Sequence, residues 1–148
     1  MISNDPNLKT ERDIVGCHLV YNGKVLYVRR NPKKAQGNLW GSPAGKVQEG
    51  EDRISAIKRE VKEEIGLELK DEDLEYLKTW KVVFNSQKKG CTYKSFSYSL
   101  YKVILDEEPN ITLRNEELFE YGWFTPEEAL RLPLVEDEDL VIKDIWNL

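Results

Sequence analysis

The chain of 148 residues is poor in cysteine and histidine, with only Cys17, Cys91 and His18. Two cysteines are too few for a disulfide scaffold, and one histidine beside them does not predict a zinc site. No apolar run approaches the roughly 20 residues needed to cross a bilayer, so no membrane-spanning segment is expected. The first residues lack the basic and then apolar pattern of a secretory signal. The scarcity of cysteine predicts a reducing, cytoplasmic location.

Positive charge is also in short supply, with 22 lysines and arginines against 27 aspartates and glutamates, a net charge of −5. Residues 106–148 hold 13 acids and 3 bases, a net of −10, and residues 1–105 hold the other 14 acids and 19 bases, a net of +5. A negative chain binds nucleic acid poorly without specific contacts, so we expect no nucleic-acid partner.

The length and a hydrophobic content of 40% predict one folded domain over residues 1–148. Within it, residues 1–12 are expected to be a flexible or strand-like N-terminal segment. Asn22-Gly23 between two apolar runs predicts a hairpin of strands 15–21 and 24–28. Further strands are expected at 74–84, 92–105 and 121–124, with loops at 31–45 and 85–90.

The clearest predicted helix spans residues 51–65. Apolar residues recur in it at helical spacing, and Gly66 follows as a stop signal. Thr125-Pro126 with a glutamate three residues after the threonine predicts another helix start, and a last helix is expected over residues 137–146. The predicted fold class is therefore α+β.

Three glutamates of the 51–65 helix, Glu60, Glu63 and Glu64, fall within an arc of roughly 100° at about 100° per residue. The apolar residues lie on another side of the cylinder, so one face contacts a core while the next presents carboxylates. Three adjacent carboxylates repel each other unless a cation compensates them, and their oxygens are ligands suited to Mg²⁺. Taken alone, such a cluster is more often a solvated helix face.

The full spacing favours the metal site, because seven positions at fixed offsets agree. They are Gly45, Glu51, Arg59, Glu60, Glu63, Glu64 and Gly66. This stretch resembles a complete Nudix box, and the chain is identified as a member of the Nudix hydrolase family. Residues 40–46 and Trp123-Phe124 are similar to the family's flanking segments, so the resemblance covers roughly residues 13–145.

The resemblance implies an αβα sandwich around a mixed sheet, with the box as a loop–helix–loop motif. It implies a hydrolase of nucleoside diphosphates linked to another group. Glu60, Glu63 and Glu64 would bind Mg²⁺ or Mn²⁺, and Arg59 would orient them. Glu51 and the carbonyl of Gly45 would be further metal ligands. In some family members the glutamate that matches Glu60 also activates water, and in others the base lies outside the box.

Residues outside the box complete the expected site. Glu117, with Glu116 and Glu120 as alternatives, stands where the family often places one more metal-binding or basic glutamate; an acidic surface loop is the competing interpretation. Basic side chains near the box are expected to meet the phosphates, and aromatic ones to stack on a base, although core packing explains most aromatics. The substrate-binding candidates are Arg29, Arg30, Lys46 and Trp40.

The resemblance leaves the substrate open. A nucleoside triphosphate cleaved to a monophosphate and pyrophosphate is the leading expectation. A nucleoside-diphosphate sugar is the first alternative, because residues 35–40 are similar to the GDP-mannose mannosyl hydrolase branch. RNA 5′-end hydrolysis and a nucleotide sensor with little turnover are the others. The family often dimerises, so a homodimer is expected by resemblance.

Overall fold

A computed structural model describes residues 1–84, 93–114 and 116–148. Its strands are β1 (Ile2–Ser3), β2 (Arg12–Tyr21), β3 (Lys24–Arg30), β4 (Trp40–Gly41), β5 (Ala44–Lys46), β6 (Glu75–Val83), β7 (Ser95–Leu105) and β8 (Leu118–Phe124). Its helices are α1 (Arg53–Ile65), α2 (Pro126–Ala129) and α3 (Glu138–Trp146), with a short 3₁₀ turn, η1 (Asp71–Asp73). The predicted loop at 85–90 lies outside the described residues.

The strands form one mixed sheet in the order β1-β6-β7-β2-β3-β4, with β5 paired to β2 and β8 paired to β3. The predicted hairpin is confirmed: β2 and β3 meet at a two-residue turn in which Asn22 and Gly23 have φ values of 52° and 76°. Positive φ at both positions matches the twist of the flanking strands. β2 also pairs in parallel with β7 along its whole length.

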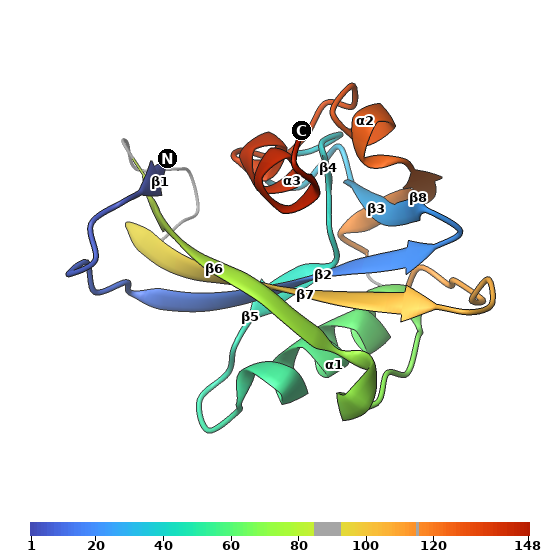
Figure 1. The fold of residues 1–148 in the computed structure, drawn as a ribbon, viewed down its shortest axis with the longest axis horizontal. Coiled ribbons are helices and arrows are strands. Elements are labelled where there is room, and N and C mark those ends of the chain that lie inside the picture. Colours follow the sequence, from blue (N-terminus) through green and yellow to red (C-terminus); the bar gives the residue numbers. More distant parts are fainter. Residues whose placement is uncertain (85–92, 115) are drawn as a thin grey trace.

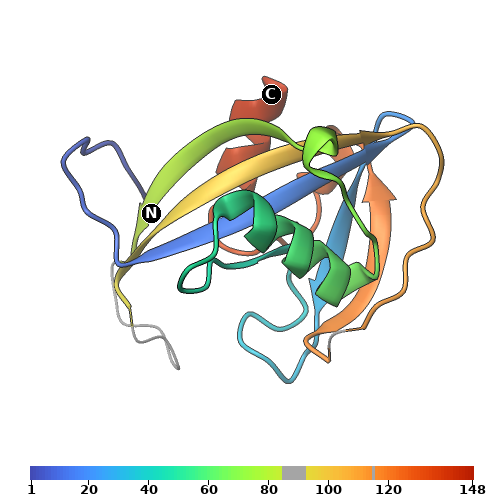
Figure 2. The same cartoon turned by 90° about the horizontal axis from the view of Figure 1, so that it is seen from below.

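Helices cover both faces of this sheet, with α1 on one side and α2 and α3 on the other (Figure 1). The view from below agrees, with α1 in front of the sheet and α3 behind it (Figure 2). Under α1, the fully buried Ile57, Val61 and Ile65 pack against Val15 and Leu26 of the sheet. The predicted α+β sandwich is therefore confirmed.

The sheet opens between β2 and β3, and this opening positions the site. β2 pairs with β3 only at Val20 and Tyr21, and at Ile14–Gly16 its partner is β5 instead. The segment 40–46 crosses the opening, because β4 pairs with β3 and β5 pairs with β2. A cleft of about 1370 Å³ lies at this place, lined by residues from both faces of the sheet.

Several element boundaries differ from the prediction: β2 begins at Arg12 and not at residue 15, β3 ends at Arg30 and not at residue 28, and β7 begins at Ser95 and not at residue 92. The expected loop at 31–45 contains the short strands β4 and β5. The helix begins at Arg53 and not at residue 51, because Asp52 is the N-cap and its side chain accepts a hydrogen bond from the Ser55 amide at 2.7 Å. The strand expected from residue 121 begins at Leu118, because it pairs with β3 as far as Arg30. Within the described residues, no helix combines the length and hydrophobicity required to span a membrane.

Candidate active site

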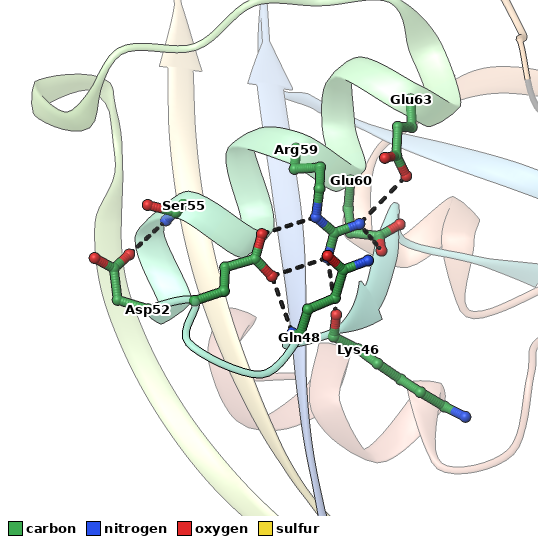
Figure 3. Close-up of polar contacts among 8 residues, drawn as sticks. Lys46, Gln48, Asp52, Ser55, Arg59, Glu60 and Glu63 are labelled. Atoms are coloured by element: carbon green, nitrogen blue, oxygen red, sulfur yellow. Dashed lines mark hydrogen bonds and ion pairs between the residues drawn. The ribbon is translucent and has the colours of Figure 1, made fainter.

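The loop between β5 and α1 folds back over the helix, so that carboxylates from both meet at one arginine (Figure 3). Asp52 starts the helix, and Gly66 ends it in the left-handed conformation with φ 75°. With the apolar side of α1 buried against the sheet, Arg59, Glu60 and Glu63 are turned toward the cleft. The local sequence thus positions the carboxylate face through its caps and its apolar stripe.

Arg59 is the centre of this arrangement. Its Nε and Nη2 donate to the two oxygens of Glu51 at 2.8 and 3.0 Å. Its Nη1 donates to Glu60 at 2.8 Å and lies 3.3 Å from Glu63, and Nη2 also donates to the Lys46 carbonyl at 2.9 Å. These contacts, drawn in Figure 3, tie the loop to the helix. Hydrogen bonds from Arg59 and the Gln48 amide lower the pKa of Glu51 to about 2.

Glu60 and Glu64 lie in a different environment from Glu51. Burial raises the pKa of Glu60 above its usual value against the opposing effect of Arg59. Glu64 is only 8% exposed, and burial together with the Glu60 charge raises its pKa well above the usual range, although the Ala44 amide donates to it at 3.3 Å. Arg59 and the Ala44 amide therefore compensate these two carboxylates only in part, since the pKa values of both remain raised.

Gly45 allows Glu60 to approach the backbone of β5. A Cβ atom at position 45 would overlap the Glu60 carboxyl group, so no other residue fits without displacing it. The φ angle of Gly45 is not in the left-handed region, so the glycine is needed for the space it leaves to Glu60 and not for its backbone conformation. Its carbonyl belongs to the same short strand beside the glutamates.

The donor chemistry fits a hard divalent cation. Glu60, Glu63 and Glu64 line one cleft, and two of them have pKa values raised by burial, which a cation would reverse. In the described part of the chain, no three histidine, cysteine, aspartate or glutamate side chains are already grouped to hold an ion. Arg59 pairs with Glu60 and Glu63 in this structure.

Glu117, Arg30 and Lys46 also line the cleft. The charge of Glu117 contributes to the raised pKa of Glu64, and that of Arg30 opposes it. The Lys46 ammonium lies 4.8 Å from the centre of the Tyr93 ring. The structure thus brings these three predicted residues to the same cleft as the box glutamates.

Two predicted substrate-binding residues lie elsewhere. Arg29 pairs with Glu120 at 2.7 Å on the neighbouring strand and stacks over Phe119 at 4.6 Å. Trp40 is 9% exposed and packs edge-on against Phe124, 5.3 Å between ring centres. Neither is among the residues that line the cleft, because strand pairing and core packing engage both side chains.

Sequence reasoning missed Ser42 and Glu138, which line the cleft on its other side. The Ser42 hydroxyl donates to Glu138 Oε1 at 2.9 Å, and Glu138 is 5% exposed. In the sequence, Glu138 belongs to an acidic run typical of a solvated helix start. Only its burial distinguishes it from its neighbours, and no local pattern predicts that burial.

The NUDIX domain model matches residues 10–145 of the chain. With the fold and the intact loop–helix arrangement, this match defines the class of protein: the chain belongs to the Nudix hydrolase family and is an enzyme.

Individual relatives agree with this. Nudix hydrolase 2 of Arabidopsis thaliana is 30% identical over 130 residues, covering 86% of this chain and 44% of that protein. CTP pyrophosphohydrolase of Escherichia coli (strain K12) is 28% identical over 122 residues, covering 82% of each. The structure of the E. coli dihydroneopterin triphosphate pyrophosphohydrolase has a TM-score of 0.72 at 21% identity, covering 96% of this chain and 100% of that one, which shows a shared fold. The chain spans less than half the length of the Arabidopsis relative.

Proposed function

We propose that this chain is a Mg²⁺-dependent pyrophosphohydrolase that converts a nucleoside triphosphate into a nucleoside monophosphate and pyrophosphate. One observation carries the proposal: Glu60, Glu63 and Glu64 all line one cleft of about 1370 Å³, which Arg30 and Lys46 line as well. The named activity of the E. coli CTP pyrophosphohydrolase supports the substrate class.

The proposed roles follow from charge and position. A pyrophosphate linkage is anionic, and a bound Mg²⁺ supplies the neutralisation and polarisation that attack on phosphorus requires. Arg59 holds Glu60 and Glu63 beside β5, and Arg30 and Lys46 are assigned to the phosphate oxygens. Glu117 or Glu60 is assigned to accept the proton of the attacking water.

Attack on phosphorus is favoured over sugar release at an anomeric carbon. The branch of the family that cleaves GDP-mannose has an altered box and a catalytic histidine. In this chain the box is complete, and Leu118 stands near the position of that histidine. Leu118 lines the cleft and packs on the hydrophobic core. Its alkyl side chain has no group that could exchange a proton.

The test is a panel of nucleoside triphosphates, nucleoside-diphosphate sugars and dinucleotides, each incubated with the enzyme and Mg²⁺ and analysed by product chromatography. We expect monophosphate and pyrophosphate from a triphosphate, no product with excess EDTA, and turnover lower by a factor of about 10³ in Glu63→Gln. Glu49→Gln, an exposed glutamate of the same loop, is the matched control. Wild-type rates in Glu63→Gln would contradict the metal assignment.

A further inference from the structure

The cleft continues beyond the box glutamates to the face of the sheet that α3 covers. Glu60, Glu63 and Glu64 line one part of it, and Ser42, Tyr98 and Glu138 are among the residues that line another. Ser42 and Gly45 are three residues apart on one crossing segment that bends at residue 43, so the segment spans at most about 10 Å between them. A nucleoside has comparable length between its base and its phosphates, so this second part is at the right distance for a base.

Glu138 is held in a fixed orientation by a buried network. Its Oε1 accepts from the Ser42 hydroxyl at 2.9 Å and lies 3.5 Å from Nε2 of the fully buried His18. The Trp146 indole donates to Nδ1 of His18 at 3.3 Å. Because Nδ1 accepts, the hydrogen of a neutral imidazole is on Nε2 and points to Glu138.

This network leaves hydrogen-bond acceptors facing the cleft. Both donors reach Oε1 of Glu138, and Oε2 accepts from none of the residues that the structure describes. The only hydrogen of the Ser42 hydroxyl goes to Glu138, so toward a ligand Ser42 also can only accept. The edge offered to a ligand is thus a pair of acceptors.

Flat apolar surface lies in the same cleft. Trp80 and Tyr98 both line it, with ring centres 6.1 Å apart and planes tilted by 34°. Trp80 is 6% exposed, and its indole nitrogen donates to Asp144 at 3.0 Å, which fixes the ring. Val141 of α3 packs with Trp80 and lines the cleft as well. Rings and aliphatic groups of this kind provide contact area for a planar heterocycle.

We infer that Glu138 and Ser42 select a base whose edge carries two adjacent N–H donors, the 2-amino-4-oxopyrimidine edge that guanine and pterins share. Adenine and cytosine present one amino donor beside a ring acceptor, and uracil and thymine present one N–H between two carbonyls. Only the 2-amino-oxo edge places two donors side by side against two acceptors. This inference rests on the proposed function, since it names the substrate class of the same site.

The test compares kcat/KM for dGTP with that for dITP, which lacks the 2-amino group, in the wild type and in Glu138→Gln. We expect the wild type to prefer dGTP by about 10-fold to 100-fold, the range that one hydrogen bond to a charged group supports. In Glu138→Gln the kcat/KM values for dGTP and dITP should agree within about threefold. The reason is that loss of the Glu138 carboxylate and loss of the 2-amino group remove the same interaction. Asp139→Asn, the next residue of α3, does not line the cleft and should retain the wild-type preference.

Further substrates distinguish a guanine nucleotide from a pterin and test whether the inference holds. Preference for dGTP over dihydroneopterin triphosphate identifies a guanine nucleotide as the source of the edge, and the reverse identifies a pterin. The wild-type comparison of dGTP with dITP needs no variant and stays decisive if Glu138→Gln does not fold. Equal rates for dGTP and dITP, or preference for dCTP or CTP, would overturn the inference while the proposed function stands. Failure of every triphosphate to turn over would instead contradict the proposed function.

Discussion

Arg59 binds Glu51 through two parallel hydrogen bonds, Nε to Oε2 at 2.8 Å and Nη2 to Oε1 at 3.0 Å. This pair closes the loop between β5 and α1, and the remaining Arg59 donors reach Glu60 and the Lys46 carbonyl. The planar guanidinium can make all of these contacts at once because its donors are fixed in one plane. The arginine therefore organises the carboxylates that we assign to the cation.

Replacement of Arg59 by lysine should show whether the site needs only the positive charge of this residue or also the arrangement of its hydrogen-bond donors. Arg59→Lys keeps the positive charge, but an ammonium cannot donate to Glu51, Glu60 and the Lys46 carbonyl with the same geometry. We expect kcat/KM to fall by about 10-fold to 100-fold in steady-state assays. Arg53→Lys is the matched control, because Arg53 lies on the same helix, pairs with Asp13 of β2 at 2.9 Å and does not line the cleft. Equal losses in both variants would refute a special role for Arg59.

Gly45→Ala should impair the site without unfolding the protein. The added methyl group overlaps the Glu60 carboxyl group and forces it to move, whereas the backbone at position 45 suits alanine. We expect kcat/KM to drop by about 100-fold, and Tm to stay within about 3 °C of the wild type.

Gly23→Ala is the control, and we expect it to lower stability without affecting the rate. Gly23 has φ 76° and no neighbour near its Cβ position, so alanine is strained there but far from the glutamates. It should lower the free energy of unfolding by about 1 kcal/mol and leave the rate unchanged. If Gly45→Ala behaved like Gly23→Ala, the close packing of Glu60 would not matter for activity.

Buried Glu64 should link stability to pH and to Mg²⁺. Its pKa in the folded protein lies well above the ordinary value of 4.5, so its contribution to stability is complete below about pH 4.5 and is lost as pH rises through the folded pKa. In EDTA at pH 7.5, Glu64→Gln should therefore have a higher Tm than the wild type, by roughly 3 °C or more. Mg²⁺ should raise the Tm of the wild type but not that of Glu64→Gln.

Scanning calorimetry at pH 5 and pH 7.5, with EDTA or 10 mM Mg²⁺, measures these shifts. The advantage of Glu64→Gln in EDTA should shrink at pH 5, where the wild-type carboxyl group gains its proton. An equal Mg²⁺ response in both proteins would show that Glu64 is not a ligand.

Glu117→Gln should distinguish proton transfer from cation binding. If Glu117 accepts the proton from water, kcat falls by about 10² to 10⁴ while the Mg²⁺ concentration for half-maximal rate stays unchanged. Glu63→Gln should instead raise that concentration. Glu127→Gln, an exposed carboxylate in the first turn of α2, is the control and should match the wild type. A raised Mg²⁺ requirement in Glu117→Gln would reassign this residue as a ligand.

Local patterns predicted the hairpin and α1 because the residues that decide them are neighbours in the chain. Asn22-Gly23 sets the turn, and Gly66 stops the helix. The resemblance led us to expect Arg59 beside the glutamates, and it contacts Glu60 and Glu63, but its contacts with Glu51 and the Lys46 carbonyl were not predicted.

Residues whose role depends on distant partners were beyond prediction from the sequence. Arg29 pairs with Glu120 because β8 lies beside β3, and Trp40 is buried in a cluster that includes Phe124 and Ile142, both far from it in the chain. Glu138 contacts His18, which is 120 residues away in the sequence, and no sequence motif predicts that contact. Contacts of this kind, between elements far apart in the chain, can be identified only from the tertiary structure.

The most direct test of the central claim is hydrolysis of a nucleoside triphosphate with Mg²⁺ in H₂¹⁸O, followed by mass spectrometry of the products. We predict a nucleoside monophosphate and pyrophosphate, with one ¹⁸O atom bound to phosphorus in one of them. Formation of a nucleoside diphosphate and orthophosphate, or turnover that continues at full rate in excess EDTA, would contradict it.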